Sequence, residues 1–274
     1  MKLTRKFKPF SIIQHLLLIL MCIIAIFPIY WMVISSFKNE SEIFTASFIP
    51  SKPTIENYVY AFSEMPIVKM MFNSFIISIL TTALQLITSI LAGYALVRWK
   101  FKGSFFIYSL LSLSWLIPFQ AIMIPNYVLI NQMGLNEQLL GVVLPFAVST
   151  FAILSLYHSF KAFPVALIEA ARLDGESDLG ILLRVVLPNI KSTVASLGIL
   201  LFINGWNEYL WPMLITKQME NAPIQIGLKS FVNSDVNMWG SLMAATTISC
   251  LPILIIYLVL QRQVVDSFVR FGIK

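Results

Sequence analysis

Long runs without Lys, Arg, Asp or Glu dominate this sequence and constrain its fold more than any other feature. Each run is close to the ~20 residues that an α-helix needs to cross a ~30 Å hydrocarbon layer. The runs are too long and too evenly apolar for the alternating strands of a membrane barrel. The sequence therefore predicts an all-α membrane protein with six transmembrane helices, at about residues 12–35, 72–97, 105–125, 139–160, 193–216 and 241–261.

Composition supports a chain that is embedded in lipid for most of its length. Of the 274 residues, 58% are hydrophobic and only 12% are charged, about half the ~25% that is usual for soluble domains. We therefore expect one transmembrane domain (12–261) between a short amino-terminal segment (1–11) and a tail (262–274), with a polar loop at about 161–191. The expected location is the plasma or inner membrane.

The distribution of Lys and Arg between the spans predicts the orientation. The amino-terminal segment, the second and fourth connections and the tail together hold 14 of these residues, and the other three connections hold 5. Short loops rich in Lys and Arg remain in the cytoplasm. Both ends of the chain and the 161–191 loop are therefore predicted to be cytoplasmic, and the net charge of +6 reflects topology rather than nucleic-acid binding.

The 161–191 loop contains a short run of strong helix formers. Pro164 precedes the run 165–174, and Gly175 follows it, which is the arrangement that favours a helix of two to three turns. Leu167, Ala170, Ala171 and Asp174 lie at helical spacing, so the two alanines can leave a low-profile surface for close approach. From the residues alone, this helix either lies along the membrane surface or fits a groove of another protein.

The loop resembles the signature segment of permease subunits in binding-protein-dependent ABC importers. The resemblance is carried by Glu169-Ala170-Ala171, then Gly175, Val185 and Leu187-Pro188 at the family's spacing, with Val185 where the family commonly has Ile. Further segments are similar to the carbohydrate-type branch, related to maltose and oligosaccharide permeases: Asn73-Ser74, 92–95, 98–103, 124–125, 133–135 and 206–212.

The resemblance implies a fold and a set of partners. The fold is the type I importer permease architecture, in which the EAA-type loop is a coupling helix that docks on a cytoplasmic ATPase. The ATPase-coupling residues would be Glu169, Ala170, Ala171, Asp174 and Gly175. The implied partners are a second permease subunit, ATPase subunits and an extracytoplasmic solute-binding protein.

Enzymatic activity is not expected in this chain. None of the eleven glycines is followed by Lys, so a phosphate-binding loop of the Gly-Lys-Ser/Thr type is excluded. No His, Cys or carboxylate cluster has metal-ligand spacing, and no cofactor is expected, because ATP would be bound by the partner ATPase.

The predicted solute path centres on an acid in the fifth span. Glu208 follows an apolar run from residue 193, and an intramembrane carboxylate usually faces a cavity or a partner group. Asn204, Trp206 and Asn207 accompany it, and Gln120 in the third span is a further candidate. Two alternatives remain open: Glu208 lies at the lipid interface between aromatic belt residues, or it ties the fifth span to a neighbouring helix.

The resemblance favours a sugar, an oligosaccharide or a polyol as the solute, with glycerol-3-phosphate as an alternative. A phosphate ester would favour Lys or Arg along the path, and the predicted spans contain none. Two other classes of protein compete with an importer subunit. A stand-alone ion-coupled carrier would depend on Glu208 for its ion, and a membrane scaffold would carry no solute.

Overall fold

The structure is a computed structural model that describes residues 9–99, 101–232 and 238–272, with side chains for 13–99, 101–232 and 238–262. Throughout these ranges the regular elements are helices. The chain divides into two compact units, one of Met1–Met65 with Leu228–Cys250 and one of Pro66–Gly227 with Leu251–Lys274. Predictions for residues 1–8 and for the side chains of the tail beyond 262 fall outside the described part.

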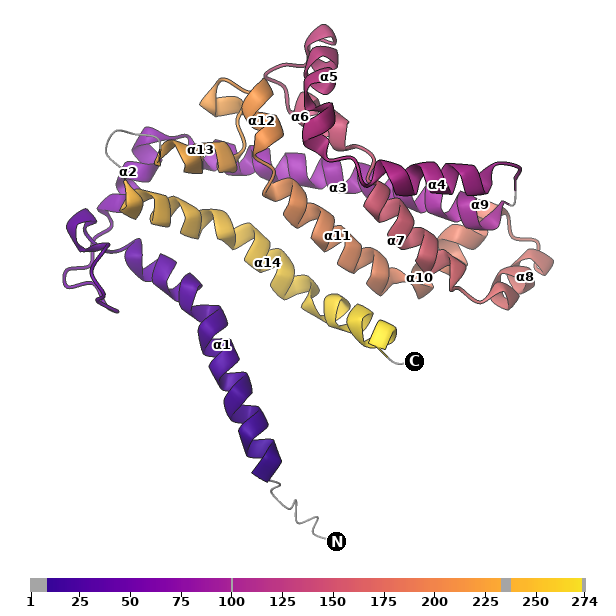
Figure 1. The fold of residues 1–274 in the computed structure, drawn as a ribbon, viewed down its shortest axis with the longest axis horizontal. Coiled ribbons are helices and arrows are strands. Elements are labelled where there is room, and N and C mark those ends of the chain that lie inside the picture. The colour runs from indigo at the N-terminus through magenta and orange to yellow at the C-terminus, as the bar shows by residue number, and fades with distance from the viewer. Residues whose placement is uncertain (1–8, 100, 233–237, 273–274) are drawn as a thin grey trace. The chain divides into compact units, whose positions relative to one another are not determined.

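Within the described part of the chain, three helices are long and apolar enough to cross a membrane alone (Figure 1): α1 (Pro9–Ser35), α3 (Ile67–Arg98) and α14 (Trp239–Gly272). Three further membrane spans are obtained only if each of three bent helix pairs is taken as a single span. This gives up to six spans by length and composition, which agrees with the number expected from the apolar runs.

The bent pairs occupy the predicted third, fourth and fifth spans. The third consists of α4 (Ser104–Ser114) and α5 (Phe119–Gln132), bent by 97°. The fourth contains α6 (Leu139–Val143), η2 (Leu144–Phe146) and α7 (Thr150–Lys161), with a bend of 46°. In the fifth region, α9 (Asp178–Gly180), the π-helix η3 (Ile181–Val186) and α10 (Leu187–Asn189) precede α11 (Lys191–Trp206) and α12 (Leu210–Ile215), with a bend of 82°.

Prolines explain only part of this bending. Pro118 is the N-cap residue of α5, at the break in the third span, and residues before proline disfavour helical backbone. Pro125 and Pro252 instead lie inside α5 and α14, and Pro212 lies in α12. The 82° bend of the fifth region falls at residue 190, just after Pro188 in α10, and the separate break between α11 and α12 falls at residues 207–209, before Pro212.

The first unit is organised around polar groups that follow α1. Lys38 is fully buried, and its Nζ donates to the carbonyl of Ser47 at 2.7 Å and lies 4.3 Å from the centre of the Trp31 ring. Asn57, in α2 (Glu56–Glu64), donates to the carbonyls of Ser36 and Lys38. Residues 13–30 of α1 are exposed, as expected for a helix surrounded by lipid. The short η1 (Glu40–Glu42) lies between these elements.

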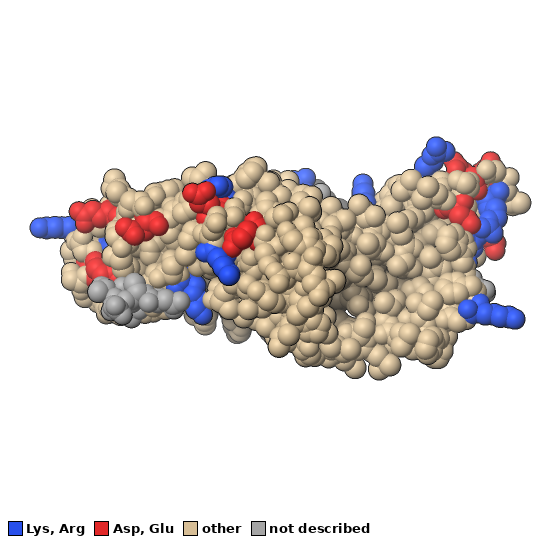
Figure 2. Space-filling view, turned by 90° about the horizontal axis from the view of Figure 1, so that it is seen from above, with Lys and Arg blue, Asp and Glu red and all other residues tan. Residues whose placement is uncertain are grey.

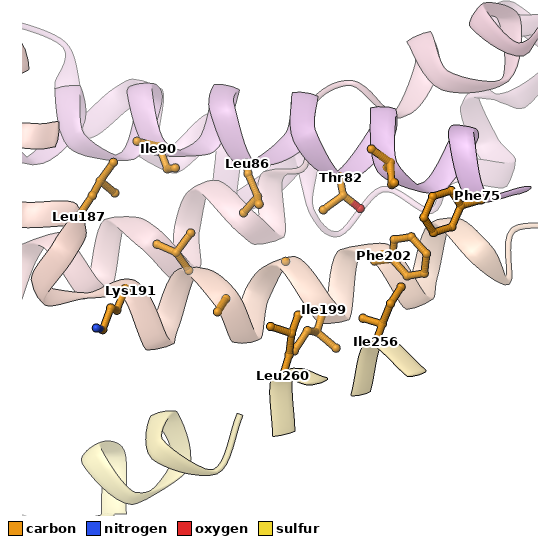
Figure 3. A pocket seen from close by; sticks show the side chains of 14 residues that line it. Phe75, Thr82, Leu86, Ile90, Leu187, Lys191, Ile199, Phe202, Ile256 and Leu260 are labelled. Carbon is orange, nitrogen blue, oxygen red and sulfur yellow. The ribbon is translucent and has the colours of Figure 1, made fainter. Parts of the chain in front are cut away.

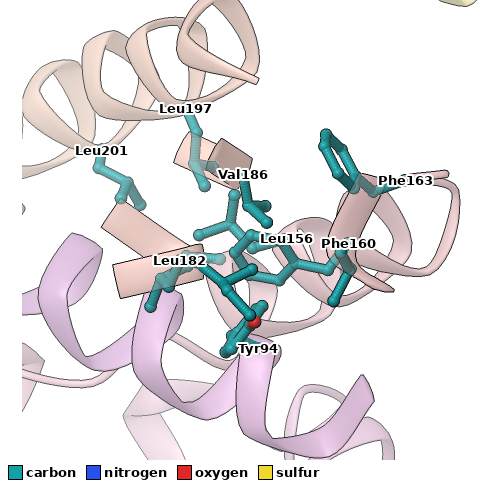
Figure 4. Close-up of a cluster of buried hydrophobic side chains, with 11 residues drawn as sticks. Tyr94, Leu156, Phe160, Phe163, Leu182, Val186, Leu197 and Leu201 are labelled. Atoms are coloured by element: carbon teal, nitrogen blue, oxygen red, sulfur yellow. The ribbon is translucent and has the colours of Figure 1, made fainter. Parts of the chain in front are cut away.

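The second unit is built on α3, against which α7 and α11 pack along their lengths. Two clusters of buried side chains stabilise it. One, at the end of α3 that carries Tyr94, is shown in Figure 4 and also receives Leu156, Phe160, Leu182 and Leu197. The other joins α3 to α5, α6 and α12 through Ile77, Ile130, Val142, Val143, Trp211 and Ile215. This unit also contains η4 (Met219–Asn221) and the start of α13 (Ile224–Ser230).

One group of charged side chains of the second unit lies where α8 (Val165–Leu173) and α9 are found. On the face shown in Figure 2, blue and red side chains gather at that end, and the surface next to them is uncharged. An uncharged surface beside a charged end is what a membrane-spanning helix bundle requires.

Candidate functional site: the α8 loop and a polar pocket

One side of α8 is anchored in the buried cluster of Figure 4. Ile168 is buried together with Phe160 and Phe163, and Ala171 packs against the same cluster. The sequence interpretation gave Ala171 an outward surface, whereas the structure turns it toward the cluster. Burial of one helical stripe fixes α8 on the unit and decides which residues point outward.

The opposite side of α8 is a projecting surface. Glu169, Ala170 and Asp174 are exposed. Apolar residues accompany them, because Val165 and Leu167 are exposed and Leu173 is 89% exposed. An exposed mixture of apolar, small and acidic side chains on a helix that is anchored from behind is suited to contact with another protein.

The end of α8 is fixed by Gly175. Its φ of +85° is left-handed, a conformation that favours glycine over residues with a Cβ atom. The Gly175 N–H donates to the Arg172 carbonyl at 3.1 Å, and the Glu176 N–H donates to the Ala171 carbonyl at 3.1 Å. These two bonds form a Schellman motif, which ends the helix and turns the chain away from it.

Three ion pairs follow this turn. Arg184 donates to Glu176 at 2.7 Å, and Arg172 donates to Asp178 Oδ1 at 2.6 Å. Arg98, at the end of α3, lies 3.9 Å from the same Asp178 oxygen. The hydrogen bonds that Asp178 accepts from Arg172 and from Trp99 Nε1 lower the pKa of its carboxyl group, so it is ionised at neutral pH. The sequence interpretation did not single out Asp178, because its partners come from two other segments, α8 and the end of α3.

A second feature of the unit is a polar pocket of about 300 Å³ between α3, α11 and the fourth-span helices. Asn204 and Glu208, both predicted path residues, line it together with Thr81 and Gln85 of α3. Trp115 and Phe151 add an aromatic wall, with ring centres 6.0 Å apart. The pocket therefore combines planar polar groups with aromatic faces.

Two of these polar groups have hydrogen-bonding capacity left for a solute. The Thr81 hydroxyl is buried and has no hydrogen-bond partner among the described residues. One Glu208 oxygen accepts from the backbone N–H of Trp211 at 3.1 Å, near the start of α12, and a carboxylate has further lone pairs. Glu208 thus both lines the pocket and stabilises the break between α11 and α12.

The other three predicted path residues lie outside this pocket's lining. Trp206 is buried, with 1% of its surface exposed, and stacks against Phe202. Asn207 is exposed and accepts a hydrogen bond from Gln225 at 3.2 Å. Gln120 is exposed near the start of α5. The five predicted path residues do not share one surface, because the helices break at 115–118 and 207–209.

A larger groove of about 680 Å³ lies between α3, α11 and the part of α14 in the same unit. Figure 3 shows that its walls are hydrocarbon, from side chains such as Phe75, Leu86, Phe202 and Leu260. Thr82 and Lys191 are the polar residues among its described lining. Such a groove suits lipid chains or apolar helices, and it offers little to recognise a hydroxylated solute.

Known proteins resemble this chain over most of its length. Residues 85–270 match the family described as binding-protein-dependent transport system inner membrane component. The chain is 30% identical over 257 residues to the lactose transport system permease protein LacG of Rhizobium radiobacter, a match that covers 94% of each chain. It is 31% identical over 256 residues to the arabinooligosaccharides transport system permease protein AraQ of Halalkalibacterium halodurans, covering 92% of each.

A phosphate-ester permease and a solved structure are also similar. The sn-glycerol-3-phosphate transport system permease protein UgpE of Brucella abortus is 28% identical over 271 residues, with 95% of this chain and 96% of UgpE covered. A chain of a bacterial ABC transporter involved in the import of the acidic polysaccharide alginate superimposes with a TM-score of 0.80 at 24% identity, covering 96% of this chain and 99% of that chain. That superposition confirms the predicted fold class. From the family match and the near-full-length relatives, the chain belongs to the family of binding-protein-dependent transport system inner membrane components.

Proposed function

We propose that this chain is the membrane-spanning subunit of an ATP-driven importer for a sugar, an oligosaccharide or a polyol. It forms the translocation path with a second permease subunit. Two cytoplasmic ATPase subunits bind and hydrolyse ATP, and an extracytoplasmic binding protein delivers the solute. Both termini and the α8 loop face the cytoplasm, as the Lys and Arg distribution predicts.

The observation that carries this proposal is the α8 surface. This helix is anchored on one side by Ile168 and ends in a Schellman turn. Its other side exposes Glu169, Ala170 and Leu173. The result is a well-fixed helix with a projecting contact surface. A fixed docking helix at the polar end of a helix bundle allows an ATPase that binds it to move the membrane-spanning helices. Transport then requires two arrangements of the helix bundle that differ in their contacts at α8.

The polar pocket supports a neutral hydroxylated solute over glycerol-3-phosphate. Its described lining holds one acid, Glu208, and neither Lys nor Arg. A phosphate group is usually recognised by Arg, Lys or backbone N–H groups, whereas a sugar is held by planar amides and carboxylates and by aromatic faces. Gln85, Asn204 and Glu208 supply the former, and Trp115 and Phe151 supply the latter.

The first experiment is a tagged purification in mild detergent with mass spectrometry of the proteins recovered. We expect an ATPase, a second permease and a binding protein. Lactose, an arabino-oligosaccharide and glycerol-3-phosphate are then tested as ligands of the recovered binding protein. Recovery of the chain alone, with solute flux in proteoliposomes that lack ATP, would replace the importer by an ion-coupled carrier. A chain that is recovered alone and carries no solute would be a scaffold.

The docking surface is tested by Glu169→Ala, with Glu176→Ala as the matched control. Glu169 is exposed on α8, whereas Glu176 forms an ion pair with Arg184 behind the turn. We expect Glu169→Ala to reduce the amount of ATPase that co-purifies by roughly 5-fold or more, with the same amount of the chain in the membrane. Equal ATPase recovery from both variants would refute the docking assignment.

The path assignment is tested by Glu208→Gln and Thr81→Val in uptake assays with the sugar bound by the recovered binding protein. Glu208→Gln keeps the hydrogen bond to Trp211 and removes the charge, and Thr81→Val removes the unpaired hydroxyl and keeps the shape. We expect a higher KM for both variants at unchanged ATPase recovery. Unchanged uptake by both would remove the pocket from the path.

Orientation is tested with single cysteines after replacement of Cys22 and Cys250. A membrane-impermeant maleimide added outside intact cells should label Lys52→Cys and leave Lys102→Cys unlabelled until the cells are opened. The reverse pattern would invert the predicted topology.

A further inference from the structure

The carboxylate of Asp178 joins the α8 loop to the end of α3. Its Oδ1 accepts a hydrogen bond from Arg172, in the last turn of α8, at 2.6 Å. Its Oδ2 accepts from the indole N–H of Trp99, the C-cap residue of α3, at 3.2 Å. Hydrogen bonds to an ionised acceptor are about twice as strong as neutral ones. One side chain therefore holds both the helix that carries the docking surface and a membrane-spanning helix.

Arg98 lies next to this junction and can form a further bond to Asp178 if the α8 loop moves. Its Nε atom is buried without a hydrogen-bond partner among the described residues. The nearest charged partner is Asp178 Oδ1 at 3.9 Å, which is beyond hydrogen-bond distance. A small displacement of the loop toward α3 would complete this bond, and a displacement away would leave Arg98 buried and unpaired. The junction is therefore sensitive to movement of α8 relative to α3.

The helix α3 connects this junction directly to the polar pocket. It is continuous from Ile67 to Arg98, and the sequence of this stretch contains no proline. Thr81 and Gln85 of α3 line the pocket. Gln85 stands about 20 Å from Arg98 along the axis, at roughly 1.5 Å per residue. Because an unbroken helix moves as one body over such a distance, a push at Arg98 displaces the pocket wall.

The covalent route from α8 to the pocket is less rigid. It passes through the π-helix η3, the short α10 and an 82° bend before it reaches Asn204 and Glu208 on the α11 side. A π-type turn and a sharp bend are places where a helix is interrupted, so this route is not one continuous helix. The chain connection alone is thus poorly suited to transmit a small movement.

We propose that Asp178 is a positioning residue that transmits movement of the α8 docking helix to α3, and through α3 to Thr81 and Gln85 in the pocket. This inference rests on the proposed function, because it requires a motor that moves α8. It assigns a distinct role to a residue outside the docking surface and outside the path.

The test follows movement of α3 in the purified importer, with ATP and orthovanadate as the probe. In a background without Cys22 and Cys250, Gln85→Cys reports the pocket wall through its rate of labelling by a small water-soluble maleimide. We expect ATP with orthovanadate to change that rate in the parent. We expect Asp178→Asn to reduce the change by roughly 5-fold or more, while the same amount of ATPase co-purifies.

Two further variants separate a positioning role from a general loss of structure. Trp99→Phe keeps an aromatic ring and removes the N–H that donates to Asp178, so it should weaken the response in the same direction. Glu176→Gln removes the neighbouring Glu176–Arg184 ion pair, which does not reach α3, and should leave the response at the parent level.

The outcomes distinguish this inference from the proposed function. If the parent chain brings down no ATPase, the proposed function is wrong. If ATPase is recovered and the labelling rate responds equally in the parent, Asp178→Asn and Trp99→Phe, the transmission role is wrong and the proposed function stands. An equal loss of response in Glu176→Gln would also refute the specific role of Asp178.

Discussion

The carboxylate of Glu40 accepts hydrogen bonds from the backbone N–H groups of Trp239 and Gly240, at 2.6 and 2.9 Å. These two residues begin α14, and the first N–H groups of a helix have no acceptors within the helix. An acid 199 residues earlier in the sequence therefore caps the last long helix within the first unit. The negative charge also complements the positive end of the helix dipole.

Replacement of Glu40 by Ala should lower the thermal stability of the purified protein. Loss of a cap from a helix typically costs about 0.5–2 kcal/mol, and Glu40→Gln should retain part of this stabilisation, because its amide oxygen is a neutral acceptor. The measurement is the thermal unfolding midpoint in detergent, with Glu56→Ala as the control. Midpoints that are equal for Glu40→Ala and Glu56→Ala would show that the cap contributes nothing.

Gly240 should tolerate no side chain, because its helix approaches Asn57 closely. A Cβ atom at Gly240 would lie 2.7 Å from Asn57 Cγ, and Asn57 is held by its hydrogen bonds to Ser36 and Lys38. Gly240→Ala should cost about 1–3 kcal/mol through overpacking. Unfolding midpoints of Gly240→Ala, Asn57→Ala and the double variant form the test. The double variant should lose less than the sum of the two single costs, because Asn57→Ala removes the clash.

Two glycines with the same backbone conformation should differ in their effect on assembly. Gly175 and Gly134 have φ values of +85° and +67°, and at either position a Cβ atom would meet nothing within 4 Å. Substitution by Ala should cost about 1 kcal/mol at each. Only Gly175→Ala should reduce ATPase recovery in the pull-down, because Gly175 ends α8. If the two variants recover similar amounts of ATPase, the Schellman turn at Gly175 is not required for docking.

The contribution of Asp178 to stability should be constant through the neutral range. Its hydrogen bonds to Arg172 and Trp99 hold its pKa below the ordinary value of 3.8. A lowered pKa in the folded state means that the stabilisation is complete above the unfolded value of about 3.9 and is lost as the pH falls through the folded value. The difference in unfolding midpoint between the parent and Asp178→Asn should be flat between about pH 5 and pH 8. A difference that already narrows at about pH 6 would contradict this assignment of the pKa.

The fold class was predictable because apolar run length reports directly on membrane crossing. The runs predicted α1, α3 and α14 to within a few residues, apart from an earlier start of α3 and the extension of α14 into the tail. The helix 165–174 and its end at Gly175 were also correct, since a proline before the run and a glycine after it are local signals. These features depend on residues that are neighbours in sequence.

Features that depend on contacts between distant segments were not predictable. The break at residues 207–209 places Glu208 in the polar pocket, whereas Trp206 is buried and stacks against Phe202. The two residues nevertheless lie close together in a single apolar run. Gln85 and Thr81 carried no sequence signal, because an amide or hydroxyl in a span is common. The capping of α14 by Glu40 and the junction at Asp178 each join segments far apart in the chain.

The exposed apolar side of α8 has a consequence for how the protein is made. Leu173, Val165 and Leu167 are exposed on this short helix, next to the charged side chains of the loop. Under the proposed docking role, a newly inserted chain that has not yet bound its ATPase exposes this apolar surface to chaperones, proteases and other unassembled chains. If α8 docks on an ATPase as proposed, cells that produce this subunit in excess of that ATPase should degrade the surplus.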